Sequence, residues 1–212
     1  LGGLDYTEAA IRQAVALAKE HDAHLTGVSV IDEERLTNVG PVPIGGSAYA
    51  ADLAEKRLEQ AKSRAQFAMH TFEQAAQEAG IERTLIQGVG EPFEDLIALA
   101  RYNDLMVFGL RSIFEYDVIE DPHDLLVRLV QAGVRPIVAV AKGFQEIHKV
   151  LIAYSGSMES AKAMKQFIHL RPWPAATVKI VSFVDGRTDT EQLLKDAADY
   201  CRAHGLNPET EV

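Results

Sequence analysis

The stretch Asp104-Leu-Met-Val-Phe-Gly-Leu-Arg-Ser112 decides the fold. An acidic residue leads into four apolar residues, and the run stops at Gly109 before polar residues follow. A continuous apolar run bounded by turn signals is typical of a strand that is buried on both faces, as in a parallel sheet. Because ligands of open α/β sheets bind at the carboxyl ends of the strands, the residues after Phe108 are the first place to expect a binding site.

Helices and strands alternate on both sides of this stretch. Helical spacing of apolar residues predicts helices, and runs rich in β-branched residues predict strands. The predicted helices cover residues 7–21, 51–79, 90–101 and 122–132, the predicted strands cover 24–31, 81–87, 104–109 and 135–141, and loops are predicted over 32–49 and 112–121. Strict alternation of this kind predicts an α/β fold with a parallel sheet and right-handed crossovers.

The same pattern restarts after a short polar connection. Strands are predicted over residues 149–154 and 177–184, helices over 157–169 and 190–204, and a third strand begins within 205–212. Ser155-Gly-Ser157 aligns with Asp5-Tyr-Thr7, so we expect two tandem copies of one α/β unit. The expected domains are residues 1–145, whose first strand is largely missing apart from residues 1–4, and residues 146–212, whose C-terminal half is missing.

Composition excludes several classes of function. The chain has 212 residues, is 47% hydrophobic and carries a formal net charge of −10. A charge of that sign argues against a nucleic-acid partner, which needs a basic face. No apolar run approaches the length of a membrane span, so no membrane partner is expected. The single cysteine, Cys201, fits a reducing compartment, and we expect a cytoplasmic protein.

Four stretches carry a resemblance to a known family. They are Val150-Leu-Ile-Ala-Tyr-Ser-Gly-Ser157, Gly27-Val-Ser-Val-Ile-Asp32, Asp104-Leu-Met-Val-Phe-Gly-Leu-Arg111 and Arg135-Pro-Ile-Val-Ala-Val140. In this order and spacing they resemble the universal stress protein family, across essentially the whole chain. The resemblance implies an open parallel five-stranded sheet with helices on both faces in each copy. That fold is Rossmann-like and similar to the adenine nucleotide alpha hydrolases.

The resemblance also implies a nucleotide site. The nucleotide-binding branch of the family holds ATP with an aspartate after the first strand, a valine ending the second, and a glycine motif after the fourth. That motif reads Gly, two residues, Gly, nine residues, Gly, then Ser or Thr. In the first domain Asp5 stands at the aspartate position, Val30 at the valine position and Gly109 at the first motif glycine.

The rest of the motif departs from the family pattern. Ser112 stands at the second glycine, and Pro122-His123 occupy the final Gly-Ser/Thr position. Proline has no N–H to donate, and the acidic residues of 115–121 disfavour a triphosphate. Ser112 and His123 can each donate one hydrogen bond, and Arg111 is a candidate phosphate contact. The first domain therefore holds a degenerate phosphate motif, and in the second domain Ser155 replaces the aspartate.

Each candidate also has a purely structural explanation. Asp5 would stabilise a helix N-terminus, and Gly109 would suit a tight turn at a strand end. Arg111 would be a solvated loop charge, and His123 an exposed residue at a helix start. No metal site is expected, because His21 and His24 lie on either side of a helix end.

Three functions follow from these residues and the resemblance. The first is a stress-response protein that binds an adenine nucleotide, ATP or AMP, with Mg²⁺ as an optional companion. The second is a tandem stress protein that has lost nucleotide binding and acts as a dimeric scaffold or regulator. The third is an ATP-hydrolysing or adenylating enzyme. No lysine or second acidic cluster near Gly109 is placed to handle Mg²⁺ and a γ-phosphate, so at most weak hydrolysis is expected and no catalytic residue is assigned.

The last strand of the first domain predicts an association. If residues 135–141 form an edge strand, its unpaired backbone groups need a partner strand. Pairing with the equivalent strand of the second domain would make the chain an intrachain pseudo-dimer, and a homodimer is the other arrangement expected.

Overall fold

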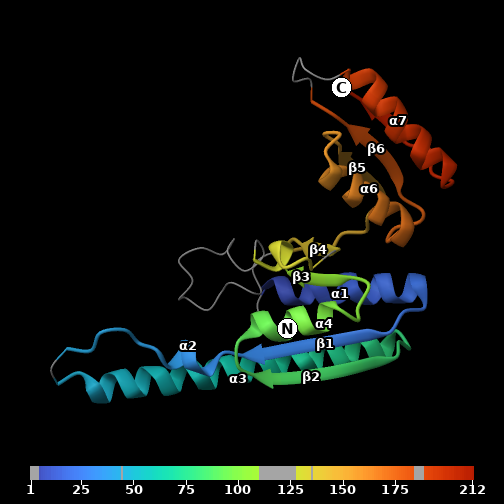
Figure 1. The fold of residues 1–212 in the computed structure, drawn as a ribbon. Coiled ribbons are helices and arrows are strands. Elements are labelled where there is room, and N and C mark those ends of the chain that lie inside the picture. Colours follow the sequence, from blue (N-terminus) through green and yellow to red (C-terminus); the bar gives the residue numbers. More distant parts are fainter. Residues whose placement is uncertain (1–4, 44, 110–127, 135, 184–188) are drawn as a thin grey trace. The chain divides into compact units, whose positions relative to one another are not determined.

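The chain divides into two compact units, Leu1–Phe144 and Gln145–Val212. The computed structural model describes residues 5–43, 45–109, 128–134, 136–183 and 189–212, and these are shown as coloured ribbon in Figure 1. Each unit has its own helices, strands and buried core, so each is described by itself.

Unit 1 alternates helices with short strands. Its elements are α1 (Asp5–His21), β1 (Leu25–Ile31), α2 (Glu33–Thr37), α3 (Ser47–Glu78), β2 (Arg83–Val89), α4 (Pro92–Ala100), β3 (Met106–Gly109) and β4 (Ile137–Val140). Residues 128–131 are also helical. Every predicted helix and strand that falls on described residues is confirmed, with ends that shift by a few residues. The predicted loop over 112–121 and most of the predicted helix over 122–132 lie outside the described residues.

The strands of unit 1 form two separate parallel pairs. Strand β1 pairs with β2 from Leu25↔Arg83 to Ile31↔Val89. Strand β3 pairs with β4 from Met106↔Ile137 to Gly109↔Val140. The α/β fold and the parallel pairing are as predicted. The single five-stranded sheet is not formed by the described strands, which make two two-stranded sheets here and one three-stranded sheet in unit 2.

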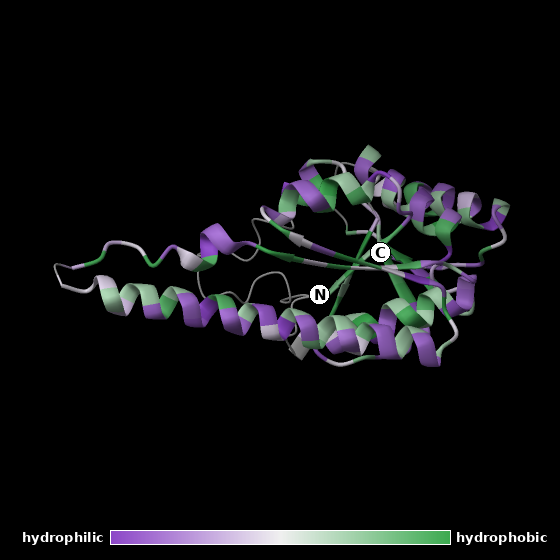
Figure 2. Ribbon diagram, turned by 90° about the horizontal axis from the view of Figure 1, so that it is seen from below, coloured by the Kyte–Doolittle hydropathy of each residue, from purple (hydrophilic) through white to green (hydrophobic). Residues whose placement is uncertain are grey.

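Small side chains let the helices of unit 1 lie close to its strands. Ala61 and Ala65 of α3 are buried against Ile31 at the end of β1. Ala9 and Ala10 of α1 are buried against Val140 of β4. Along the whole of α3, purple and green turns alternate, as expected for a helix with one apolar stripe (Figure 2).

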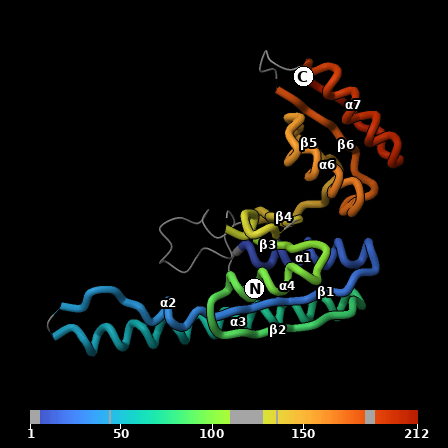
Figure 3. Tube along the Cα trace, viewed as in Figure 1, coloured from blue at the N-terminus to red at the C-terminus, as the bar shows by residue number. Residues whose placement is uncertain are grey.

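The predicted loop over residues 32–49 is wrong at both of its ends. Helix α2 occupies Glu33–Thr37, and α3 begins at Ser47 rather than near residue 51. Asp32 caps α2, because its Oδ1 accepts a hydrogen bond from the Arg35 amide at 2.9 Å. The buried Leu36 then packs on α3, and α2 and α3 run side by side in Figure 3. A helix of five residues is too short to show a hydrophobic period.

Unit 2 is a three-stranded parallel sheet with two helices. Its elements are β5 (Lys149–Ala153), α6 (Met158–Leu170), β6 (Thr177–Val181), α7 (Thr190–Ala203) and β7 (Glu209–Glu211), and the strand order is β5-β6-β7. All five were predicted from the sequence. Ser157 caps α6 and Asp189 caps α7, each through a side-chain oxygen that accepts an amide hydrogen bond.

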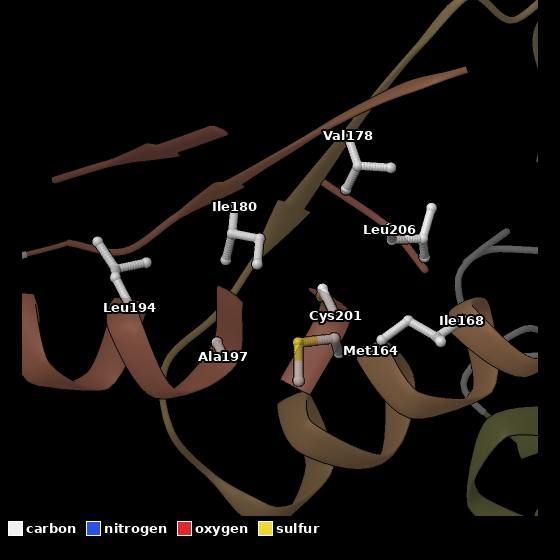
Figure 4. Packing of buried hydrophobic residues seen from close by; sticks show 8 residues of the cluster. All are labelled: Met164, Ile168, Val178, Ile180, Leu194, Ala197, Cys201 and Leu206. Atoms are coloured by element: carbon white, nitrogen blue, oxygen red, sulfur yellow. The ribbon is translucent and has the colours of Figure 1, made fainter. Parts of the chain in front are cut away.

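One apolar cluster holds unit 2 together. Figure 4 shows its eight buried members, which come from both helices, from β6 and from the chain after α7: Met164, Ile168, Val178, Ile180, Leu194, Ala197, Cys201 and Leu206. Because α6 and α7 supply the helical side chains, both helices pack on the same face of the sheet. Cys201 is fully buried there, and burial raises the pKa of its thiol.

Candidate functional site

A cavity of about 340 Å³ lies within unit 1, between β1, β3, α1 and α4. It is lined by Thr7, Ala10, Ile11, Ala14, His24, Leu25, Thr26, Gly27, Val28, Val30, Asp32, Arg35, Phe72, Glu91, Pro92, Phe93, Leu96, Leu99, Asn103, Leu105, Met106, Val107, Phe108, Gly109 and Arg128. Most of the lining residues are apolar, and we call the space along them the channel. The lining also includes Asp32 just after β1, Glu91 just before α4, Arg35 and Arg128, and we call the part formed by these residues and the ends of β1 and β3 the mouth.

Two of the predicted nucleotide-binding residues meet at the mouth. Val30 is the penultimate residue of β1, and Gly109 is the last residue of β3. Val30 is half-buried, Gly109 is buried, and both line the cavity although they lie far apart in sequence. The structure therefore brings them to one place at the carboxyl ends of parallel strands, where open α/β sheets bind their ligands.

The other predicted residues fall on parts of the chain that are not described. Arg111, Ser112 and His123 lie outside the described residues. Asp5 is the first residue of α1, but its side chain is not among those described. Its near neighbour Thr7, one of the residues aligned with Ser155–Ser157 of the second copy, is 4% exposed and lines the cavity.

Four charged residues form the mouth with them, and the sequence did not single out any of the four as ligands. They are Asp32, Arg35, Glu91 and Arg128. Asp32 had a visible signal, since it directly follows the apolar strand β1 and its carboxylate caps α2. Arg128 had no such signal, because only the fold brings the helix over residues 128–131 to the start of α4.

Arg128 is held in place by two contacts from the α4 side. Its guanidinium carbon lies 4.0 Å from the centre of the Phe93 ring, and its Nη2 lies 3.4 Å from Glu91 Oε1. Stacking on an aromatic face fixes the guanidinium plane while leaving donors for a planar anion. The side chain of Arg128 remains 43% exposed, so an anion at the mouth can reach it.

Gly27 is required where the channel meets α3. A Cβ at this position would lie 2.8 Å from Cε1 of Phe72 and 3.0 Å from Cδ2 of Leu85. Real Cβ atoms do not approach other carbons so closely, so the absent side chain is what lets the Phe72 ring pack on β1. The Gly27 seen in the sequence motif therefore has a packing role on the face next to the channel.

The corresponding position of unit 2 has different chemistry. Ser155 Oγ lies 3.1 Å from Ser157 Oγ and 3.3 Å from Ser160 Oγ. Ser157 Oγ in turn accepts a hydrogen bond from the Ser160 amide as the cap of α6. These hydroxyls bond to one another and to the helix start, and in the sequence Ser155 stands where the first copy has Asp5.

The described residues also limit other kinds of site. Within them, no group of three or more His, Cys, Asp or Glu side chains is placed to hold a metal ion. None of the helices in the same part of the chain is long and apolar enough to cross a membrane.

Comparison with known proteins identifies the family. The model of the universal stress protein family matches residues 1–112, which is more than half of the 212 residues. This chain belongs to the universal stress protein family. No curated protein matches the sequence of this universal stress protein.

A solved structure supports the same fold over a longer span. The crystal structure of a universal stress protein from Archaeoglobus fulgidus DSM 4304 matches with a TM-score of 0.65. The match covers 96% of this chain and 72% of that chain at 15% sequence identity. At that identity the match concerns the fold alone. The universal stress protein fold therefore extends beyond the residues of the family model.

Proposed function

We propose that this universal stress protein binds an adenine nucleotide at the mouth of unit 1. The observation that carries the proposal is the meeting of Val30 and Gly109 in one cavity at the carboxyl ends of β1 and β3. The apolar side chain of Val30 suits the adenine base, and the charged mouth beside it suits the phosphate of the nucleotide. A glycine at a strand end lets a phosphate approach the backbone.

The charges at the mouth supply what the degenerate glycine motif lacks. Arg35 and Arg128 are the cations that would hold a phosphate group, and Arg128 is already oriented by Phe93. Asp32 and Glu91 balance them, so the described mouth carries no excess positive charge. We therefore propose that the site prefers AMP to ATP, since each further phosphate adds negative charge that no described cation offsets.

Titration of the 212-residue chain with AMP, ADP and ATP tests this function. Isothermal calorimetry should show saturable binding of AMP and weaker binding of ATP. Arg128→Gln should weaken AMP by about tenfold or more, because a hydrogen bond to a charged group is lost. Arg101→Gln is the matched control, since Arg101 is exposed and does not line the cavity. Absence of binding by all three nucleotides would refute the proposal.

A scaffold or regulator without nucleotide is the second candidate. It is favoured by unit 2, where Ser155 stands in place of the aspartate and bonds to Ser157 and Ser160. In this case none of the three nucleotides would bind in the titrations, and light scattering should show a defined oligomer of the chain.

The tandem architecture is part of the same proposal. We propose that the two units are copies of one universal stress protein domain, divided near residue 145. Its support is the shared order of elements, because α1-β1-α3-β2 in unit 1 corresponds to α6-β6-α7-β7 in unit 2. Pairing of the last strands in a pseudo-dimer or homodimer stays a prediction from the sequence.

A further inference from the structure

The acidic residue that precedes α4 does not cap this helix with its side chain. Glu91 stands at the N-cap, and Pro92 follows it at the start of the helix. A carboxylate at an N-cap ordinarily accepts hydrogen bonds from the first amides of its helix. Within the described residues of α4, no amide donates such a bond to Glu91. The carboxylate contacts Arg128 instead, with Oε1 lying 3.4 Å from Nη2.

The contact between Glu91 and Arg128 is weak enough to be exchanged for a ligand. It joins one oxygen to one nitrogen, and 3.4 Å exceeds the typical length of about 2.7–2.9 Å for a charge-assisted hydrogen bond. The side chains are 58% and 43% exposed, respectively. An exposed ion pair of this kind is worth a factor of up to about five in an equilibrium constant. A group that offers two oxygens to the guanidinium can therefore displace the carboxylate.

Arg128 keeps its position without help from Glu91. Its guanidinium carbon lies 4.0 Å from the centre of the Phe93 ring, and this stacking fixes the guanidinium plane. The next residue, Leu129, is 0% exposed and belongs to the apolar cluster that contains Leu96 of α4. Because the ring and this buried neighbour anchor Arg128, loss of the Glu91 contact would free its donors without releasing its side chain.

The two carboxylates of the mouth are placed differently. Asp32 caps α2, since its Oδ1 accepts a hydrogen bond from the Arg35 amide at 2.9 Å. Glu91 contacts the guanidinium that the proposed site assigns to the phosphate. Carboxylate and phosphate oxygens carry charge of the same sign and accept hydrogen bonds from the same donors. A phosphate therefore meets Glu91 as a rival for Arg128.

We propose that Glu91 competes with the phosphate group for Arg128 and thereby determines which adenine nucleotide the mouth prefers. The inference rests on the proposed nucleotide site. In the free chain the carboxylate contacts the guanidinium, and a bound nucleotide displaces it but leaves its negative charge beside the phosphates. This charge repels every phosphate of the ligand, so the penalty is smallest for AMP and largest for ATP. Glu91 thus lowers the affinity for all the nucleotides and favours AMP among them.

Calorimetric titration of Glu91→Gln with AMP and ATP tests this role, because glutamine keeps the size of the side chain and removes its charge. We expect AMP to bind about two- to fivefold more tightly than to the unsubstituted chain. ATP should gain more, so that the preference for AMP falls by about twofold or more. Both gains should shrink as salt is added. Glu94→Gln is the matched control, since Glu94 is an exposed acid in the first turn of α4 that does not line the cavity.

The outcomes separate this inference from the proposed site itself. If neither the unsubstituted chain nor Glu91→Gln binds a nucleotide, the proposed site is wrong and the inference falls with it. If the unsubstituted chain binds AMP and Glu91→Gln binds it equally or more weakly, the site stands but Glu91 does not compete. An equal gain in Glu94→Gln would also overturn the inference, because the effect would then come from the net charge of the chain.

A double variant tests whether the competition is for Arg128. In the Arg128→Gln background Glu91 has no guanidinium to occupy, so Glu91→Gln should improve AMP binding less than it does in the unsubstituted chain, by a factor of about two. Equal gains in both backgrounds would overturn the competition. Circular dichroism checks that the variants fold, and both positions are exposed in the structure. If the double variant does not fold, the comparison of Glu91→Gln with Glu94→Gln still decides.

Discussion

Replacing Gly27 by alanine tests how the long helix packs on the sheet of unit 1. The new Cβ would lie 2.8 Å from Cε1 and 2.9 Å from Cδ1 of Phe72, and 3.0 Å from Cδ2 of Leu85. Phe72 is only 3% exposed, so its ring is packed against protein and can move only toward the cavity that it lines. Either the Phe72 ring and the Leu85 side chain turn away from the new Cβ, or the helix and the strand move apart, and each response loses packing around β1.

The expected loss of stability combines two opposing terms. Overpacking of a core by one carbon destabilises by about 1–3 kcal/mol. Removing a glycine from a strand recovers about 0.5–1 kcal/mol of conformational entropy. The net change in the free energy of unfolding for Gly27→Ala is then a loss of about 0.5–2 kcal/mol.

Urea denaturation followed by circular dichroism measures this change. Gly143→Ala is the control, because nothing lies within 4 Å of a Cβ at that position. Adding Phe72→Leu to Gly27→Ala should show a coupling of about 1 kcal/mol that relieves the clash. The packing would be refuted if Gly27→Ala were as stable as the control and the two substitutions were additive.

Three further predictions concern unit 2. Ile180→Ala should destabilise by about 2–5 kcal/mol, since Ile180 is 0% exposed. Leu151→Ala, at a 63% exposed position, should change the free energy of unfolding by less than about 0.5 kcal/mol. Unfolding followed by the fluorescence of the single tryptophan measures both changes, and equal effects would contradict the burial of Ile180 in the core. Cys201, whose thiol pKa is raised by burial, should react with a disulfide reagent only after denaturant is added, and rapid reaction of the folded chain near neutral pH would contradict its burial. The hydrogen bond and charge of Lys179 lower the pKa of Glu211 in the folded chain. The ion pair therefore stabilises the fold above the carboxyl pKa of the unfolded chain, and this stabilisation is lost as pH falls through the carboxyl pKa of the folded chain. In Lys179→Met the Glu211 pKa measured by NMR should rise, and an unchanged pKa would show that the pair does not form.

Most of the elements were predictable because their signals are local. The helices over 7–21 and 190–204 have apolar residues at helical spacing, and most of the strands are short runs rich in β-branched or other apolar residues. Helix α2 was missed because five residues give no period. Its only signal was Asp32 before two glutamates, which is a cap followed by an acidic first turn.

The candidate site was predictable only where it follows strand ends. Gly109 was expected from its place at the end of an apolar run, Val30 was expected from the resemblance to the family, and the structure places both in one cavity. The contribution of Arg128 depends on where its helix crosses α4, and the contact with Phe93 spans a separation that no local pattern encodes.

The nucleotide site is tested most directly by an NMR titration of the isotope-labelled chain with AMP. We expect saturable shifts of the Val30 and Gly109 amide signals, at the carboxyl ends of β1 and β3, with little change at Ser157 in unit 2. Saturable shifts at Ser157 with none at Val30 and Gly109 would place the nucleotide in unit 2, and no shift anywhere would mean that the mouth does not bind it.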